Sequence, residues 1–194
     1  MRSRSSLLPL LALVLAGCAA APAPTVRHYR LHAGDPTPLA GPALQGVLLV
    51  ERPRADSFTS QRNVAYRRAG GSAPELLRYA HHRWADPPPR MLEREIAQFL
   101  RTAGVAETVV TSEIRTSPDW ILHTRIVQLE QVREPNGLVL ELEFSVEGTG
   151  DGSLRLQERL RTETPVASGD VATYVAAQNE ALTESLAALL AALR

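Results

Sequence analysis

Two segments of the sequence, residues 138–147 and 154–164, alternate apolar and polar residues with a period of two. This pattern is typical of β-strands with one buried and one solvent-exposed face. The glycine-rich stretch EGTGDG lies between them and predicts a hairpin turn. We therefore predict that glutamates of the first strand pair with arginines of the second, each pair contributing about 0.2–1 kcal/mol. The apolar positions are Leu140, Leu142, Phe144, Val146, Leu154, Leu156 and Leu160, and the polar positions are Glu141, Glu143, Ser145, Glu147, Arg155, Arg159 and Arg161.

Two other segments have the 3.6-residue period of a helix. Residues 85–104 predict a helix with Asp86 as its N-cap and Gly104 just past its end. Its apolar side is Met91, Leu92, Ile96, Phe99 and Leu100, and Glu93, Arg94 and Arg101 are expected to face away. The second helix is predicted over residues 171–193, with Asp170 as its cap. Its core stripe is Val171, Tyr174, Val175, Gln178, Leu182, Leu186, Leu189 and Leu193.

Further β-like stretches occur before and between the helices. The run at 46–52 is interpreted as a strand buried on both faces, and 61–68 with 75–82 as a hairpin. The alternation in 120–133 is too irregular to assign its faces. With strands also expected at 26–32 and 105–114, the order predicts one α+β domain with a mostly antiparallel β-sheet and two packed α-helices.

Charge and cysteine content exclude several classes of function. The chain has 21 basic residues, all arginine, and 21 acidic residues, so its formal charge is zero. No net basic field would attract a nucleic acid. Its single cysteine excludes an intramolecular disulfide and a cysteine-rich zinc site.

The sequence contains no recognisable catalytic motif. His81 and His82 are adjacent, so on a strand they would point to opposite faces and could not grip one ion. No HExxH and no GxSxG pattern occurs. We therefore predict no catalytic residue, no metal ligand and no bound cofactor.

The N-terminus has the layout of a bacterial export signal. Arg2 and Arg4 precede an apolar run, Leu7–Leu15, which is too short to span about 30 Å of hydrocarbon. The run ends in Leu-Ala-Gly-Cys18, which resembles the lipobox of bacterial lipoproteins. That resemblance implies cleavage before Cys18 and a diacylglycerol group on its thiol, with Ala19 implying sorting to the outer membrane. A membrane-anchoring helix and an ordinary signal peptide are the alternatives.

These features divide the chain into three parts. Residues 1–17 are predicted to be a lipoprotein signal peptide, and residues 18–25 the lipidated cysteine with a flexible Ala/Pro tether. Residues 26–194 are predicted to form the folded domain.

The segment YAHHRWADPPP, residues 79–89, combines aromatic and basic residues where a strand passes into a helix. Such residues are favoured anchors at protein interfaces, so Tyr79, His81, Arg83 and Trp84 are candidates for partner docking. The alternative is that Trp84 packs beneath the start of the helix.

Several motifs in order resemble the auxiliary lipoproteins of ABC-type transport systems, which include the lipoprotein of the paraquat-inducible system. They are the lipobox, HYRL, GVLLVERP, SQRNVAYRR, ELLRYAHHRWADPPPRMLEREIAQFL and an Ala/Leu-rich C-terminal helix. The resemblance implies a non-catalytic component, anchored in the outer membrane of a Gram-negative bacterium with its domain in the periplasm. It implies MCE-domain proteins and an inner-membrane ABC permease and ATPase as partners, and lipids or other hydrophobic molecules as cargo. The acyl lipid on Cys18 is the only attached group implied.

A stand-alone periplasmic lipoprotein, which binds a ligand or assists envelope assembly, is the alternative, and an enzyme is a third. A deep apolar pocket would favour ligand binding, whereas a flat or grooved surface with exposed aromatic residues would favour docking. A homo-oligomer is left open by the sequence.

Overall fold

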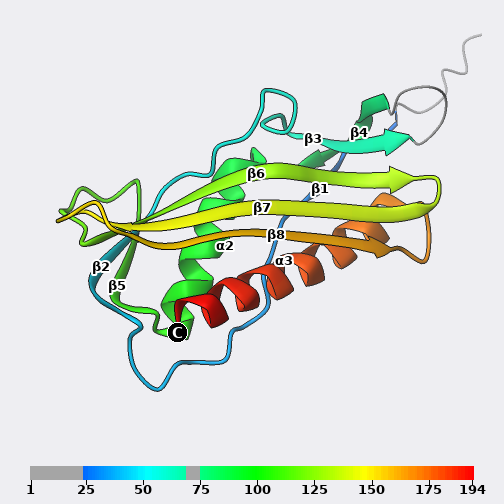
Figure 1. The fold of residues 1–194 in the computed structure, drawn as a ribbon. Helices are drawn as coiled ribbons and strands as arrows, with labels where there is room; N and C mark the ends of the chain where they lie inside the picture. Colours follow the sequence, from blue (N-terminus) through cyan, green and yellow to red (C-terminus); the bar gives the residue numbers. More distant parts are fainter. Residues whose placement is uncertain (1–23, 69–74) are drawn as a thin grey trace, which may run out of the picture.

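A computed structural model describes residues 24–68 and 75–194, which form one sheet and two helices (Figure 1). The α+β class predicted from the sequence is confirmed. The elements are β1 (Arg27–Tyr29), β2 (Leu44–Val50), β3 (Asn63–Arg68), β4 (Glu75–Trp84), α2 (Pro88–Ala103), β5 (Ala106–Thr111), β6 (Trp120–Arg133), β7 (Asn136–Gly148), β8 (Leu154–Pro165) and α3 (Val171–Leu193).

The long strand β6 organises the sheet. Along one edge it pairs antiparallel with β7, which pairs antiparallel with β8. Along its other edge it pairs in parallel with β2 near its start and with β3 near its end. Strand β5 extends the β2 branch, and β4 and β1 extend the β3 branch. The sheet is therefore mostly antiparallel, as predicted, but not purely so, because β2 joins β5 and β6, β3 joins β6, and β1 joins β4, in short parallel ladders.

The predicted pairing of the last two strands is confirmed, with Glu141 opposite Arg161 and Glu143 opposite Arg159. One expectation for this hairpin is wrong, because Leu154 is 58% exposed. The register shifts between Val146 and Glu147, so Leu154 lies opposite Glu147 and away from the core. A second shift, in β6 between Ile126 and Gln128, explains why its alternation could not be read.

Helix α2 confirms the predicted apolar side and ends at Ala103, just before Gly104, whose positive φ of 70° places it in the left-handed region. The predicted cap is wrong: Pro87 occupies the N-cap position, and the Asp86 carboxylate instead accepts a 2.9 Å hydrogen bond from Arg94. The expectation that Glu93 faces solvent is also wrong. Its side chain is only 2% exposed, because Arg52 and Ser112 from neighbouring segments donate to its carboxylate.

Helix α3 has the bounds and the cap predicted from the sequence. The Asp170 carboxylate accepts hydrogen bonds from the backbone N–H groups of Ala172 at 2.9 Å and Thr173 at 3.1 Å. These bonds satisfy donors that the first helical turn leaves free. All eight residues of the predicted core stripe are buried.

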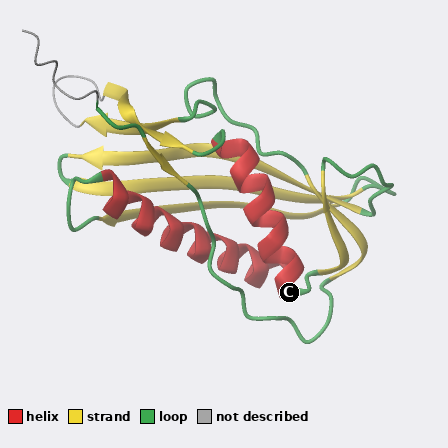
Figure 2. Cartoon of the chain, turned by 180° about the vertical axis from the view of Figure 1, so that it is seen from behind, coloured by secondary structure: helices red, strands yellow, loops and turns green. Residues whose placement is uncertain are grey.

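Both helices cover the same face of the sheet, and the segment 30–43 crosses over them (Figure 2). In this segment the backbone N–H of Ala33 donates to Glu95 of α2, and that of Gly34 donates to Thr183 of α3. The segment buries Leu31 against the helices and so closes the core. The core residues of the described domain run from Leu31 to Leu193.

The short strands depart from their predicted lengths. Strand β1 covers three residues of the expected 26–32 stretch, and β5 covers six residues of 105–114. In β2, Leu48 and Val50 are fully buried but Val47 and Leu49 are only half-buried, so the strand is not enclosed on both faces. No helix in the described part of the chain is long and apolar enough to cross a membrane.

Candidate docking surfaces

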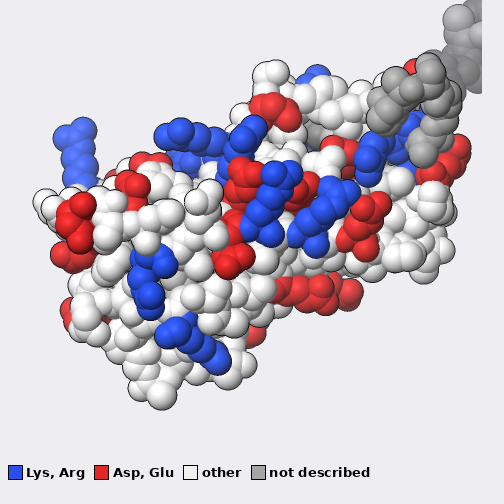
Figure 3. Space-filling view, viewed as in Figure 1, with Lys and Arg blue, Asp and Glu red and all other residues white. Residues whose placement is uncertain are grey.

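The face of the sheet opposite the helices, which we call the open face, carries interleaved positive and negative side chains (Figure 3). At its centre the Glu141 side chain is 6% exposed and binds the guanidinium groups of both Arg159 and Arg161. Glu143 binds Arg159 at 3.1 Å and lies 3.8 Å from Arg125 of β6. Burial favours the neutral acid, but hydrogen bonds from the two β8 arginines outweigh it and lower the pKa of Glu141. This face is therefore charged and internally paired.

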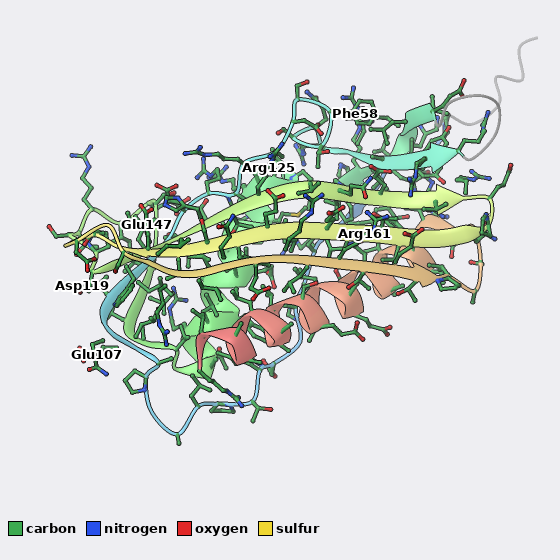
Figure 4. The ribbon with its side chains drawn as sticks, viewed as in Figure 1. Phe58, Glu107, Asp119, Arg125, Glu147 and Arg161 are labelled. Atoms are coloured by element: carbon green, nitrogen blue, oxygen red, sulfur yellow. The ribbon has the colours of Figure 1, made fainter. Side chains whose placement is uncertain are left out.

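His123 of β6 is held between two carboxylates on the same face. Its Nδ1 lies 2.8 Å from Glu51, just after β2, and its Nε2 lies 3.2 Å from Glu147 of β7, labelled in Figure 4. Burial lowers the pKa of His123, but the two glutamates outweigh burial and raise it above its ordinary value. Since both ring nitrogens are engaged, neither is free to bind a metal ion or act as a base. Within residues 24–68 and 75–194, no group of three or more His, Cys, Asp or Glu side chains is placed to hold a metal ion.

A hollow of about 780 Å³ lies on the open face over β6, β7 and β8. Charged side chains dominate its rim, among them Arg54, Arg125, Glu143 and Arg159. It therefore lacks the apolar lining that would favour a stand-alone ligand-binding protein.

One end of the sheet, which we call the distal tip, consists of the β5–β6 loop (residues 112–119), the β7–β8 turn (149–153) and Leu154. The two connections are joined, because the Thr149 backbone N–H donates to Asp119 O at 2.9 Å and its hydroxyl donates to Pro118 O at 2.7 Å. In Figure 4 the labelled Asp119 lies at this end. The tip exposes two large apolar side chains, Ile114 at 55% and Leu154 at 58%. Sequence reasoning missed this surface, because it placed Leu154 in the core.

Asp119 also fixes the tip to β2. Its carboxylate accepts a 2.7 Å hydrogen bond from the backbone N–H of Val47. The preceding Gly46 has a φ of 82°, and a Cβ there would lie 2.1 Å from Asp119 Oδ2. Glycine is therefore required for this close approach.

The four docking candidates from the sequence do not form one surface. Trp84 is 1% exposed and belongs to the core, so it cannot contribute to docking in the folded domain. Tyr79 is half-buried, and its hydroxyl donates to Gln131 at 2.8 Å. His81 and Arg83 are exposed on β4, and a docking role for them and for Tyr79 stays a prediction. Cys18 lies outside the described residues.

The family model for ABC-type transport auxiliary lipoprotein components matches residues 29–190. No curated protein matches the sequence. The fold is similar to that of protein XCC0632 from Xanthomonas campestris, with a TM-score of 0.74 at 23% identity, covering 85% of this chain and 93% of that one.

Two further solved structures share the fold. One is an uncharacterized protein with a TM-score of 0.68 and 13% identity, covering 87% of this chain and 98% of its own. The other is the hypothetical protein CT253 from Chlamydia trachomatis, with a TM-score of 0.51 and 12% identity, covering 77% and 98%. At these identities the likeness concerns the fold alone.

Proposed function

The chain belongs to the family of ABC-type transport auxiliary lipoprotein components, and we propose that it is the outer-membrane-anchored member of an MCE-type lipid transport system. In this role it acts by docking and not by catalysis. The observation that carries the proposal is the family match, which extends over residues 29–190 and so over almost the whole described domain.

The proposed anchor is an acyl lipid on Cys18. Eight residues separate Cys18 from Arg27, where β1 begins. The domain would therefore be confined to a thin layer beside the leaflet, and its effective concentration for a membrane-bound partner would rise. Replacing Cys18 with serine is expected to leave an unacylated precursor, detected by intact mass and by loss of membrane fractionation. Normal acylation of this variant would contradict the proposed anchor.

We assign partner docking to the distal tip, with an MCE-domain protein as the occupant. The apolar side chains of Ile114 and Leu154 are more than half exposed, and a partner that covers them gains the free energy of burying apolar surface. The paired charges of the open face offer less, because each ion pair would have to be desolvated or broken.

The test is capture of an MCE-domain protein from the same genome by the purified mature lipoprotein. Leu154→Ser is expected to lower capture at least tenfold, because it removes apolar contact without touching the core. Glu184→Ser, at an exposed position of α3, is the matched control and should leave capture unchanged. Absence of capture by the unaltered protein, with no transport defect on deletion, would contradict the proposed function. Unchanged capture by Leu154→Ser would move docking away from the tip.

A further inference from the structure

The end of the sheet opposite the distal tip has a different character. We call it the basic corner, and it comprises the exposed side chains of β1, of β4, of the residue before β1 and of the end of β3. The chain enters the domain here, and in Figure 1 the ribbon begins beside β3 and β4. The exposed residues are Val26, Arg27, His28, Arg68, Glu75, Leu76, Arg78, Ala80, His81 and Arg83.

The charge of the basic corner is predominantly positive. Four arginines and one glutamate give a net charge of +3, in a chain whose formal charge is zero. No carboxylate of the described residues forms an ion pair with any of these four arginines. Arg78 lies instead over the ring of Phe58, 3.7 Å from its centre. On the open face, by contrast, Arg159 and Arg161 are both held by glutamates.

Apolar and aromatic groups accompany these arginines. Val26 and Leu76 are two of the exposed large apolar side chains of the described domain, at 38% and 37%. On the neighbouring strands, Tyr66 of β3 and Tyr79 of β4 pack with ring centroids 4.5 Å apart. Arginine, tyrosine and scattered aliphatic residues are the combination that rests stably at the boundary between lipid headgroups and water.

We propose that the basic corner lies against an anionic phospholipid leaflet and so orients the domain on its membrane. The inference rests on the anchor at Cys18 from the proposed function. The eight residues between Cys18 and Arg27 let the two lie at most about 30 Å apart, so the entry point of the chain must stay near the leaflet. The corner at that entry carries unpaired positive charge, which anionic lipids attract. In this arrangement, His81 and Arg83 contact lipid headgroups and not a protein partner.

Vesicle binding by residues 19–194, which contain every core residue of the described domain but not the cysteine proposed to carry the lipid, tests the corner without the anchor. The probe is sedimentation with vesicles of phosphatidylethanolamine and phosphatidylglycerol, compared with vesicles of phosphatidylcholine alone. Each arginine near an anionic surface strengthens binding about fivefold. The double variant Arg27→Glu/Arg83→Glu is therefore expected to weaken binding to the anionic vesicles by at least about 25-fold.

The matched control is Arg115→Glu/Arg155→Glu, which makes the same change in net charge at exposed positions near the distal tip. It should weaken binding far less than the corner variant. Equal losses in the two variants, or no preference for anionic vesicles, would overturn the proposal. A corner variant that loses capture of the MCE protein but keeps vesicle binding would assign the corner to the protein partner. Because this assay needs neither acylation nor the MCE protein, its result is independent of the proposed function.

Discussion

The buried carboxylate of Glu93 should contribute much to the stability of this domain for the few atoms that it comprises. Its side chain is 2% exposed. Its carboxylate accepts from Arg52 Nε at 2.8 Å, from the Ser112 backbone N–H at 3.2 Å, and from the Ser112 hydroxyl. It thus joins the middle of α2 to the segments that follow β2 and β5.

The cost of substitution follows from these three bonds. Neutral hydrogen bonds contribute about 1 kcal/mol net and charged ones about 1.5–3 kcal/mol. Because the Arg52 side chain is 49% exposed, water can take over much of its pairing, which lowers the figure for that bond. We expect Glu93→Ala to lower the free energy of unfolding by about 3 kcal/mol. Glu93→Gln, which keeps an acceptor for Ser112, should lower it by about 1–2 kcal/mol.

Urea unfolding followed by tryptophan fluorescence and circular dichroism would measure both changes. Glu184→Gln, which neutralises an exposed glutamate on α3, is the control and should stay within about 0.5 kcal/mol of the unaltered chain. The account would be refuted if Glu93→Gln unfolded with the same free energy as the control, or if Glu93→Ala lowered the free energy of unfolding no more than Glu93→Gln.

The pH dependence has a definite sign. Burial opposes ionisation of Glu93, but hydrogen bonds from Ser112 and Arg52 outweigh it, so its pKa is lowered on folding. The stabilisation is therefore present above the ordinary glutamate pKa of about 4.3 and is lost as the pH falls through the folded-state value. Glu93→Gln should remove that acid sensitivity.

Three further changes test other parts of the fold. Because the pKa of His123 is raised on folding, its pairing with Glu51 and Glu147 stabilises the fold below pH 6.5, and this stabilisation is lost as the pH rises through the folded-state pKa. His123→Gln should therefore flatten the dependence of the melting temperature on pH, and an unchanged dependence would exclude the pairing. Gly46→Ala should cost at least about 2 kcal/mol because of its positive φ and the Asp119 contact, while Gly41→Ala, which has no atom within 4 Å of the added Cβ, should be neutral in urea unfolding. Gln178 is fully buried, and neither amide atom has a hydrogen-bond partner among the described residues, so Gln178→Leu should raise the unfolding free energy by about 1–3 kcal/mol; a loss would show that the amide is paired.

Periodicity predicted the long strand β7 and the helix α3 because each of them turns one apolar face to the core. In β7, Leu140 and Phe144 are buried whereas Glu143 is not, and a shift of one residue would reverse this. In α3, the stripe from Val171 to Leu193 allows only one orientation against the sheet. Local pattern is sufficient where burial of one face dominates the energy.

Pairing between distant segments is not encoded in local pattern. Strand β2 shows a short apolar run, which fits a parallel or an antiparallel neighbour equally, and only the tertiary fold places it between β5 and β6. The same limit applies to Glu93, since its burial depends on Arg52 and Ser112, residues 41 and 19 positions away. The bulge that exposes Leu154 likewise comes from its register with β7.

The two surfaces assigned here lie at opposite ends of β6, and this spacing constrains where a partner can meet the domain. Strand β6 begins at Trp120 beside the distal tip and ends at Arg133 beside β3 and β4. Its 14 residues, at about 3.3 Å each, separate the two ends by about 40 Å. With the basic corner on the leaflet, Ile114 and Leu154 would point away from the membrane, toward an assembly approaching through the periplasm. If the corner were instead the docking surface, the tether would bring the partner to the leaflet itself. Resonance energy transfer between labelled lipid and a dye at Ser153→Cys in the lipidated protein separates these arrangements. The first holds the dye far from the leaflet and predicts uniformly weak transfer. The second fixes no distance between the dye and the leaflet and predicts a broad range of transfer efficiencies.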